Sequence, residues 1–360
     1  MAPPMLSPLP KSDPGQWTYH VIDGAQCRDG SPAGFYTRFS TADSKHLLIY
    51  LEGGGACFNA ALCTFNPASV QESIGPGGRD IATTATQGLL DVMQAPETTG
   101  IFDFTNSKNP FLDWNMVWIP YCTGDVFSGT RENATDPDIP GTQQFVGYYD
   151  MQKFVGHIVP TFSDADRVVL TGTSAGSFGA GMNFNQVQDA FGKVPVTLIM
   201  DSGIIFTDDY LPACLQKRWR ELWGNDAALP PECTECRHPD GGGFANLLTF
   251  SARKYPNAKL GIISAVDDGV MSFFYSFGEN DCKGGPYPAG KYQTALQALR
   301  TVGEGFPGQS ASYFVLRKTH TYEQTPDFYD LPADKRPTGY VPIAAWMSDV
   351  LAGAMTQVGP

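Results

Sequence analysis

The chain has 360 residues, of which 42% are hydrophobic and 12% aromatic, so it holds enough apolar material for a large core and is not expected to be disordered. Its formal net charge of -13 argues against nucleic acid or an anionic membrane as a partner, because both repel an acidic surface. The sequence has no run of about 18 apolar residues, so we expect no membrane-spanning segment.

An α/β chain of this length commonly forms one elaborated domain, and we expect a single domain over residues 16–360. Residues 1–15 are rich in Pro and Ser and are predicted to form a poorly ordered arm. Residues 64–109 and 206–250 are rich in turn-forming residues. They are predicted to be cap or loop insertions, the first with a helix near residues 88–93.

The first predicted elements are two antiparallel strands over residues 17–23 and 34–40, where apolar and polar residues alternate. Residues 46–52, HLLIYLE, form a buried strand that runs directly into the glycines at 53–55. Such a loop is typical of the oxyanion hole of α/β-hydrolases, because glycine lets the backbone approach a reacting carbonyl. A flexible turn is the alternative interpretation.

Residues 116–121 form another central strand, and Asp125 just beyond it is interpreted as a turn cap rather than part of a pocket floor. The later elements are expected in the alternating order of an α/β sheet. They are a helix at 148–159, a strand at 167–171, a helix at 175–191, and strands at 196–200, 259–266 and 312–317.

The sequence GTSAG at residues 172–176 separates the strand at 167–171 from the helix that follows. This is the G-x-S-x-G pattern of a nucleophile elbow, in which a sharp turn holds a serine hydroxyl at a strand tip, above the N-terminus of the next helix. The strand before it and the helix after it favour a catalytic Ser174 over a tight structural turn.

A serine hydroxyl needs a base to remove its proton and a carboxylate to orient that base. Of the five histidines, only His320 follows a late strand at the carboxyl edge of the sheet. Asp267 and Asp268 follow the strand at 259–266, which gives the order Ser, Asp, His of α/β-hydrolases. We choose Asp267, the first residue beyond the strand, and keep Asp268 as the alternative, with Asp201 a weaker competitor.

The eight cysteines lie in loop-like sequence, which favours disulfides and an oxidising compartment, either secreted or periplasmic. Residues 1–15 lack the basic and then apolar pattern of an export signal, so we expect that signal to have been removed. Cys57 and Cys63 are close enough in sequence for a disulfide bond between them to close a short loop. Cys233 and Cys236 lack a second ligand pair of the usual form, so we expect no zinc there.

Four separated motifs together resemble the pectin acetylesterase family, which also includes Notum-type carboxylesterases. They are CRDGSPAG at 27–34, LEGGGAC at 51–57, IPYC with GD between 119 and 125, and GTSAG at 172–176. The resemblance implies an α/β-hydrolase-like fold, a mostly parallel sheet with helices on both faces and disulfide-pinned loop insertions.

The resemblance also implies roles for individual residues. Ser174 is the expected nucleophile, Asp267 and His320 complete the triad, and the N–H groups of Gly54, Gly55 and Ala175 form the oxyanion hole, with no metal or cofactor. It further implies Cys27–Cys122 and Cys57–Cys63 bridges, which leave Cys214, Cys233, Cys236 and Cys282 to pair among themselves.

The chain departs from the family pattern at the pocket. Where the family usually has a large aromatic residue in the oxyanion loop, this chain has Gly55 and Ala56. Thr173 stands where a cysteine is usual, and no cysteine lies beside His320. The smaller loop side chain should widen the acyl side of the pocket.

The expected function is a monomeric serine esterase that forms an acyl-enzyme. Its expected substrate is an O-acetylated polysaccharide or another short-chain acyl ester. A lipid-type deacylase shares the same machinery and differs only in the pocket. A catalytically silent carbohydrate-binding protein on an esterase fold is the alternative from another class.

Overall fold

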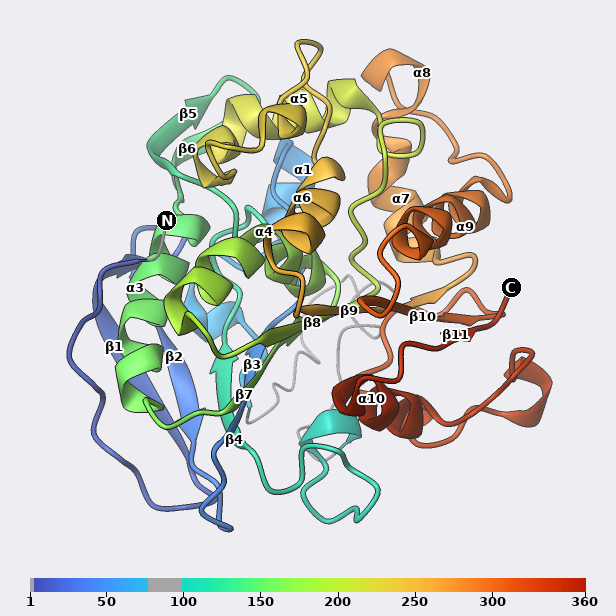
Figure 1. Cartoon of the computed structure of the whole chain (residues 1–360). Coiled ribbons are helices and arrows are strands. Elements are labelled where there is room, and N and C mark those ends of the chain that lie inside the picture. The colour runs from blue at the N-terminus through green and yellow to red at the C-terminus, as the bar shows by residue number, and fades with distance from the viewer. Residues whose placement is uncertain (1–2, 77–98) are drawn as a thin grey trace.

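The computed structural model describes residues 3–76 and 99–360, so the helix expected near residues 88–93 lies outside the described part (Figure 1). A nine-stranded sheet runs through the molecule in the order β1-β2-β4-β3-β7-β8-β9-β10-β11. Its strands are β1 Trp17–Gln26, β2 Pro32–Arg38, β3 His46–Leu51, β4 Asn115–Ile119, β7 Arg167–Gly172, β8 Val196–Asp201, β9 Lys259–Ala265, β10 Ser310–Val315 and β11 Gln357–Val358. A separate hairpin pairs β5 Arg131–Asp136 with β6 Ile139–Phe145.

The sheet is parallel from β4 to β11, and β2 pairs antiparallel with both β1 and β4. Its central strands are buried on both faces, which is why they are nearly continuous runs of Val, Ile and Leu. In β3, Leu47 and Ile49 pack into one core while Leu48 and Tyr50 pack into another. The predicted mostly parallel α/β sheet is therefore confirmed.

The helices are unequally divided between the two faces. Figure 1 shows α3, α4, α6 and α9 on one side of the sheet and α10 on the other. The helices are α1 Ala60–Phe65, α3 Gly147–Thr161, α4 Ala175–Phe191, α5 Ala213–Trp223, α6 Asn246–Lys254, α7 Gly269–Ser276, α8 Glu279–Cys282, α9 Lys291–Glu304 and α10 Ile343–Ala352. No helix among the described residues is long and apolar enough to cross a bilayer.

Two expectations about loop-like segments need adjustment. The N-terminal arm follows α3 rather than projecting freely, because Leu6 donates its N–H to the carbonyl of Gly156 and Leu9 donates to the hydroxyl of Thr161. The segment expected as a loop insertion at 206–250 contains α5 and the start of α6. The single-domain layout itself stays a prediction.

All eight cysteines form disulfides. The pairs are Cys27–Cys122, Cys57–Cys63, Cys214–Cys282 and Cys233–Cys236. The first two are the pairs that the family resemblance implies. The Cys233–Cys236 bond occupies both thiols that were considered as half of a zinc site.

Asp150 on α3 is buried, and its carboxylate accepts the N–H of Gln26 and lies 3.3 Å from the Lys153 ammonium. Burial raises the pKa of Asp150 from 3.8 to about 7 despite the attraction of Lys153. A carboxyl whose pKa is raised by folding stabilises the fold fully below its unfolded pKa and loses that contribution as the pH rises through the folded pKa.

We therefore predict that the free energy of unfolding of the native protein falls between about pH 4 and pH 7, and that this fall is absent in Asp150→Asn. A pKa rise of that size corresponds to roughly 4 kcal/mol. Urea unfolding at pH 4.5 and 7.5 measures the difference. An equal change with pH in both proteins would show that Asp150 is not its source.

Candidate active site

Ser174 lies in a tight turn between β7 and α4. Its backbone φ is 56°, a left-handed value that is strained for any residue except glycine. The turn requires Gly176, because a Cβ there would lie 2.0 Å from the carbonyl oxygen of Leu51. Ser174 is the N-cap of α4, yet its side chain makes no capping hydrogen bond. The hydroxyl is therefore not committed to holding the helix.

Five adjacent parallel strands each bring one part of the site to their carboxyl ends. In sheet order these strands are β3, β7, β8, β9 and β10. The glycine loop follows β3, Ser174 follows β7, Asp201 is the last residue of β8, Asp268 follows β9 and His320 follows β10. Because these strands are neighbours and point the same way, parts that are far apart in sequence converge on one edge of the sheet.

The glycine loop passes directly beside Ser174. A Cβ on Gly53 would lie 3.1 Å from the Cβ of Ser174, and one on Gly54 would lie 2.5 Å from the ring of Tyr121. Within the described residues, the N–H groups of Gly54, Gly55 and Ala175 donate no hydrogen bond. Three backbone donors are therefore available close to Ser174, as an oxyanion hole requires.

His320 is held by Asp268. The Nδ1–H of His320 donates to Oδ2 of Asp268 at 2.8 Å, and both side chains are at most 2% exposed. The other carboxylate oxygen accepts the N–H groups of Val270 and Met271, so Asp268 also caps α7. Nε2 of His320 is buried and has no partner among the described groups. This arrangement leaves a lone pair on Nε2 that can accept a proton.

The structure brings Asp268, the alternative kept in the sequence analysis, to His320, and not the chosen Asp267. The carboxylate of Asp267 is 49% exposed and lies 3.2 Å from the ammonium of Lys318 at the surface. The chain turns at the next residue to begin α7, and this turn directs Asp268 inward. The missed signal is the helix N-cap, since Asp is a preferred cap and the sequence GVMSFFYS that follows is a helix.

The remaining candidates have other roles. Asp125 is fully buried and accepts the Thr123 hydroxyl and the N–H of Gly147, as expected for a structural cap. Burial raises the pKa of Asp125 to about 6. The other histidines bind elsewhere: His20 to Thr37, His46 to Asp166, His157 to the carbonyl of Ser7 and His238 to Asp208.

Ser174 opens onto an apolar pocket with about 370 Å³ of empty space, part of it open to solvent. Its walls are almost entirely apolar. The lining residues are Gly55, Ala56, Val126, Ser174, Ala175, Phe178, Trp219, Met271, Phe274 and Tyr275. The ring of Phe274 lies over Gly55, where a Cβ would approach it to 3.2 Å. The pocket beside Ser174 therefore suits an apolar group.

Comparison with known proteins supports the resemblance noted in the sequence. Residues 18–249 match the family described as Pectinacetylesterase. The chain belongs to this family. Its fold is that of the Wnt deacylase Notum from Drosophila, with a TM-score of 0.63 over 95% of each chain at 20% identity.

Relatives in the family align over part of their length. The chain is 29% identical over 228 residues to the palmitoleoyl-protein carboxylesterase NOTUM of Drosophila melanogaster, covering 58% of this chain and 31% of the relative. It is 26% identical over 232 residues to pectin acetylesterase 11 of Arabidopsis thaliana, covering 61% and 54%. The matched part therefore spans about a third to a half of these relatives.

One departure from the family pattern has a structural counterpart. Thr173, the residue before Ser174, forms a 2.7 Å hydrogen bond with the hydroxyl of Tyr50. Its hydroxyl also donates to Oε1 of Gln324 at 3.3 Å. A threonine therefore connects the elbow to β3 and to the segment after His320 at this position.

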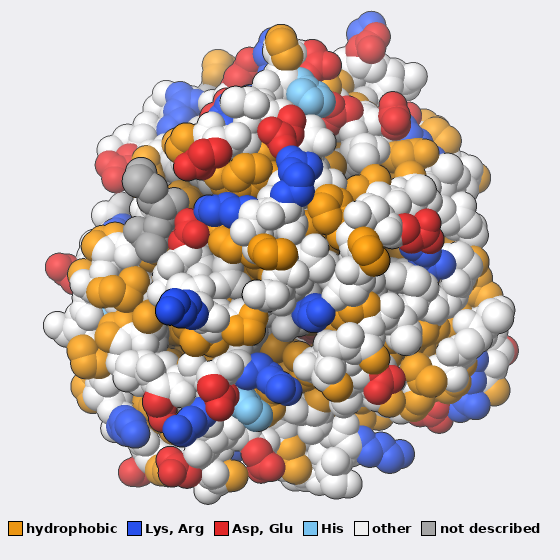
Figure 2. All heavy atoms as spheres, viewed as in Figure 1, with side chains coloured by type: hydrophobic (Ala, Val, Ile, Leu, Met, Phe, Trp, Pro, Cys, Tyr) orange, Lys and Arg blue, Asp and Glu red, His pale blue; other side chains and the backbone are white. Residues whose placement is uncertain are grey.

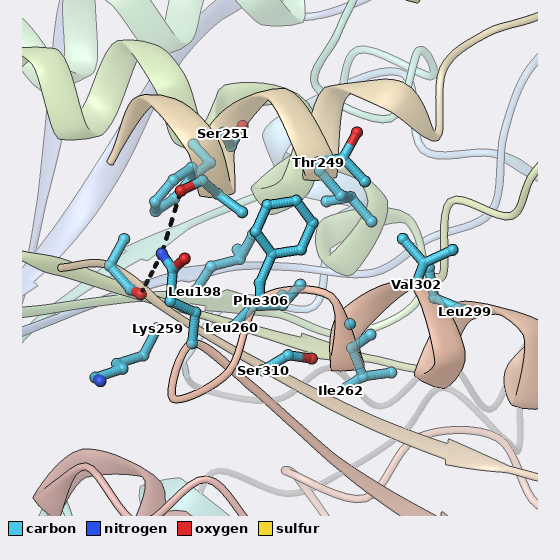
Figure 3. A pocket seen from close by; sticks show the side chains of 16 residues that line it. Leu198, Thr249, Ser251, Lys259, Leu260, Ile262, Leu299, Val302, Phe306 and Ser310 are labelled. Atoms are coloured by element: carbon cyan, nitrogen blue, oxygen red, sulfur yellow. Dashed lines mark hydrogen bonds between the residues drawn. The ribbon is translucent and has the colours of Figure 1, made fainter. Parts of the chain in front are cut away.

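A second, larger pocket of about 570 Å³ lies between the sheet, α6 and α9. Figure 3 shows Thr249 and Ser251 of α6 on one wall and Leu299 and Val302 of α9 on another. The amide of Gln309 is held by the carbonyls of Ala252 and Ala258. Within the described part of the chain, no histidine, cysteine or carboxylate lines this pocket, unlike the sheet edge that carries Ser174, Asp268 and His320.

The face drawn in Figure 2 carries both positive and negative side chains. Lys and Arg side chains are interspersed there with Asp and Glu, with hydrophobic side chains between them. The net charge of -13 is therefore not gathered into a single acidic patch on this face.

Proposed function

We propose that the protein is a serine carboxylesterase that hydrolyses acyl esters through an acyl-enzyme on Ser174. The observation that carries the proposal is the buried His320, bound through Nδ1 to Asp268 and with Nε2 unpartnered, at the same sheet edge as the elbow. Membership of the pectinacetylesterase family supports it.

In the acylation step, Nε2 of His320 takes the proton of the Ser174 hydroxyl as the oxygen attacks the ester carbonyl. The carbonyl oxygen becomes an anion, which the N–H groups of Gly54, Gly55 and Ala175 stabilise, each by about 3 kcal/mol. The C–O bond to the alcohol then breaks, and the alcohol leaves with the proton from the imidazolium.

In deacylation, water takes the place of the alcohol. His320 removes a proton from the water, whose oxygen attacks the acyl carbon, and Ser174 leaves with that proton. Asp268 holds the ring in the tautomer with Nδ1–H throughout and stabilises the positive charge that forms in both steps.

The pocket at Ser174 favours acyl groups longer than acetyl. Acetyl would place only a methyl group in a pocket walled by Phe178, Trp219, Met271 and Phe274. Each further methylene that is buried stabilises the bound state by about 0.8 kcal/mol, or roughly fourfold in kcat/KM. Deacetylation of a polysaccharide is the second candidate, because Arabidopsis pectin acetylesterase 11 is a relative.

The test is the rate of hydrolysis of p-nitrophenyl acetate, butyrate, hexanoate and octanoate, beside acetate release from acetylated pectin and xylan. We expect kcat/KM to rise from acetate to hexanoate. We also expect Ala56→Trp, which fills the pocket, to lower kcat/KM for octanoate at least about tenfold and for acetate by less than about threefold.

Ala61→Trp is the matched control, because Ala61 is exposed on α1 and the substitution leaves the pocket open. A steep decline beyond acetate in the unmodified protein would contradict the longer-acyl assignment and support the deacetylase. Absence of hydrolysis of every ester would contradict the esterase itself.

We also propose that the enzyme works outside the reducing cytosol, in a secreted or periplasmic location. Four disulfides, with no free cysteine in the part of the chain described, are consistent with an oxidising compartment. The acylated carbohydrate or small ester that it acts on should be neutral rather than strongly anionic, given the net charge of -13. The monomeric state stays a prediction.

A further inference from the structure

The turn at the end of β8 contacts both Ser174 and the adjacent strand β9. The carbonyl of Asp201 accepts the N–H of Ser174 at 2.9 Å, and the N–H of Ser202 donates to the carbonyl of Ile263 on β9 at 2.9 Å. Gly203 packs so closely that a Cβ there would lie 1.8 Å from the carbonyl oxygen of Ser174. The backbone of this turn therefore fixes the position of the elbow.

The side chains of the same turn bind the segment after His320. Oδ2 of Asp201 accepts the N–H groups of Tyr322 and Glu323, both at 2.7 Å. The hydroxyl of Ser202 accepts the N–H of Thr321 at 3.1 Å and donates to Oδ1 of Asp201 at 2.8 Å. Two fully buried side chains thus bind the three consecutive N–H groups that follow His320.

Backbone strain gathers at the same place. Ser174, Ser202 and Thr321 have φ values of 56°, 61° and 65°, all in the left-handed region. Such residues cost about 1 to 3 kcal/mol each and persist only where the surroundings hold them, as at active sites. Here the hydrogen bonds of Asp201 and Ser202 join all three.

We propose that Asp201, assisted by Ser202, is the positioning residue that sets the place of His320 relative to Ser174. Its carbonyl binds the nucleophile segment and its carboxylate binds the base segment, so one residue connects the two. The inference rests on the proposed esterase function. Asp201 acts through the two segments and contacts no substrate.

The charges around Asp201 fit this role. Burial raises the pKa of Asp201, while the two N–H donors, Ser202 and the charge of His320 oppose that rise. Burial and the nearby Asp201 hold the pKa of Glu323 well above its usual range, and the Glu323 carboxyl accepts the Thr171 hydroxyl. The carboxyl groups that interact with His320 are those of Asp268, through the hydrogen bond at Nδ1, and of Asp201, through its nearby charge. Burial raises the pKa of Tyr50 and of Tyr322.

The first test compares kinetics of Asp201→Ala, Asp201→Asn and Ser202→Ala with hexanoate ester. Asp201→Ala should lower kcat at least about 100-fold with KM changed less than about threefold, because the base is misplaced and the acyl pocket is untouched. Ser202→Ala, which loses one of the three contacts, should lower kcat about three- to tenfold. Asp150→Asn is the control for loss of a buried carboxylate and should leave kcat unchanged.

Asp201→Asn keeps an acceptor for the two N–H groups and removes the charge. The acid limb of its kcat/KM profile should move to lower pH, because the imidazolium of His320 has lost a neighbouring anion. A purely structural role would lower the rate without moving that limb. If Asp201→Ala fails to fold, the acid limb of Asp201→Asn alone tests whether Asp201 is a positioning residue.

The second test needs no catalysis. Hydrogen exchange of a peptide covering residues 318–325 should accelerate at least about tenfold in Asp201→Ala, which removes the acceptor, and not in Asp150→Asn. Accelerated exchange in a protein that hydrolyses no ester would leave the positioning role intact and refute the esterase. Unchanged exchange together with an unmoved acid limb would overturn the inference.

Discussion

Replacing Ser174 with alanine should remove ester hydrolysis while leaving the fold intact. The Ser174 hydroxyl is the only atom placed to attack in the proposed mechanism, so kcat should fall at least about 10⁴-fold, the remainder coming from the oxyanion donors and binding. The hydroxyl makes no capping hydrogen bond to α4, so its removal should change the melting temperature by less than about 2 °C.

The measurement is hydrolysis of p-nitrophenyl hexanoate, with mass spectrometry after treatment with a fluorophosphonate that labels active serines. The label should appear on the peptide containing Ser174 and vanish in Ser174→Ala. Ser251→Ala is a matched control, because Ser251 is another buried serine, on α6, and should retain both activity and labelling. Full activity in Ser174→Ala, or a label on a different serine, would refute the assignment.

Exchanging Asp268 for asparagine should be nearly as damaging, with kcat falling about 10⁴-fold. The amide can donate to Nδ1 of His320, which then holds its proton on Nε2 and can no longer accept one from Ser174. Asparagine is also a good N-cap, so α7 should keep its start and the protein should stay folded.

Asp267→Asn is the decisive control for this experiment, because it alters the adjacent residue in the same way. Asp267 is half exposed and pairs with Lys318 at the surface, so its loss should change kcat/KM by less than about twofold. Both variants are compared by kcat and KM with the same ester. A large loss in Asp267→Asn and a small one in Asp268→Asn would reverse the assignment.

The local sequence pattern was sufficient to predict the central strands and the turn at Ser174. The strand expected at 167–171 is β7 at Arg167–Gly172, and the strand expected at 46–52 is β3 at His46–Leu51. These strands are buried on both faces, so their apolar composition reports their position directly. The turn at 172–176 was predictable because its glycines are required by close backbone contacts.

Spacing could not distinguish Asp267 from Asp268, because one residue of rotation at the end of a strand reverses which side chain faces inward. The helix α5 inside the segment at 206–250 was also not predicted, although Leu215, Trp219 and Leu222 recur on one buried face. The contacts of Asp201 join residues 121 and 122 positions apart, and no local pattern carries that information.

The order in which the sheet is built also determines when the proposed active site is completed during synthesis. Ser174 follows β7 and His320 follows β10, so the ribosome synthesises Ser174 well before His320. At translation rates of roughly 5–20 residues per second the delay is on the order of ten seconds. In the proposed mechanism, a nascent chain therefore lacks the base that activates Ser174 until its final strands have emerged.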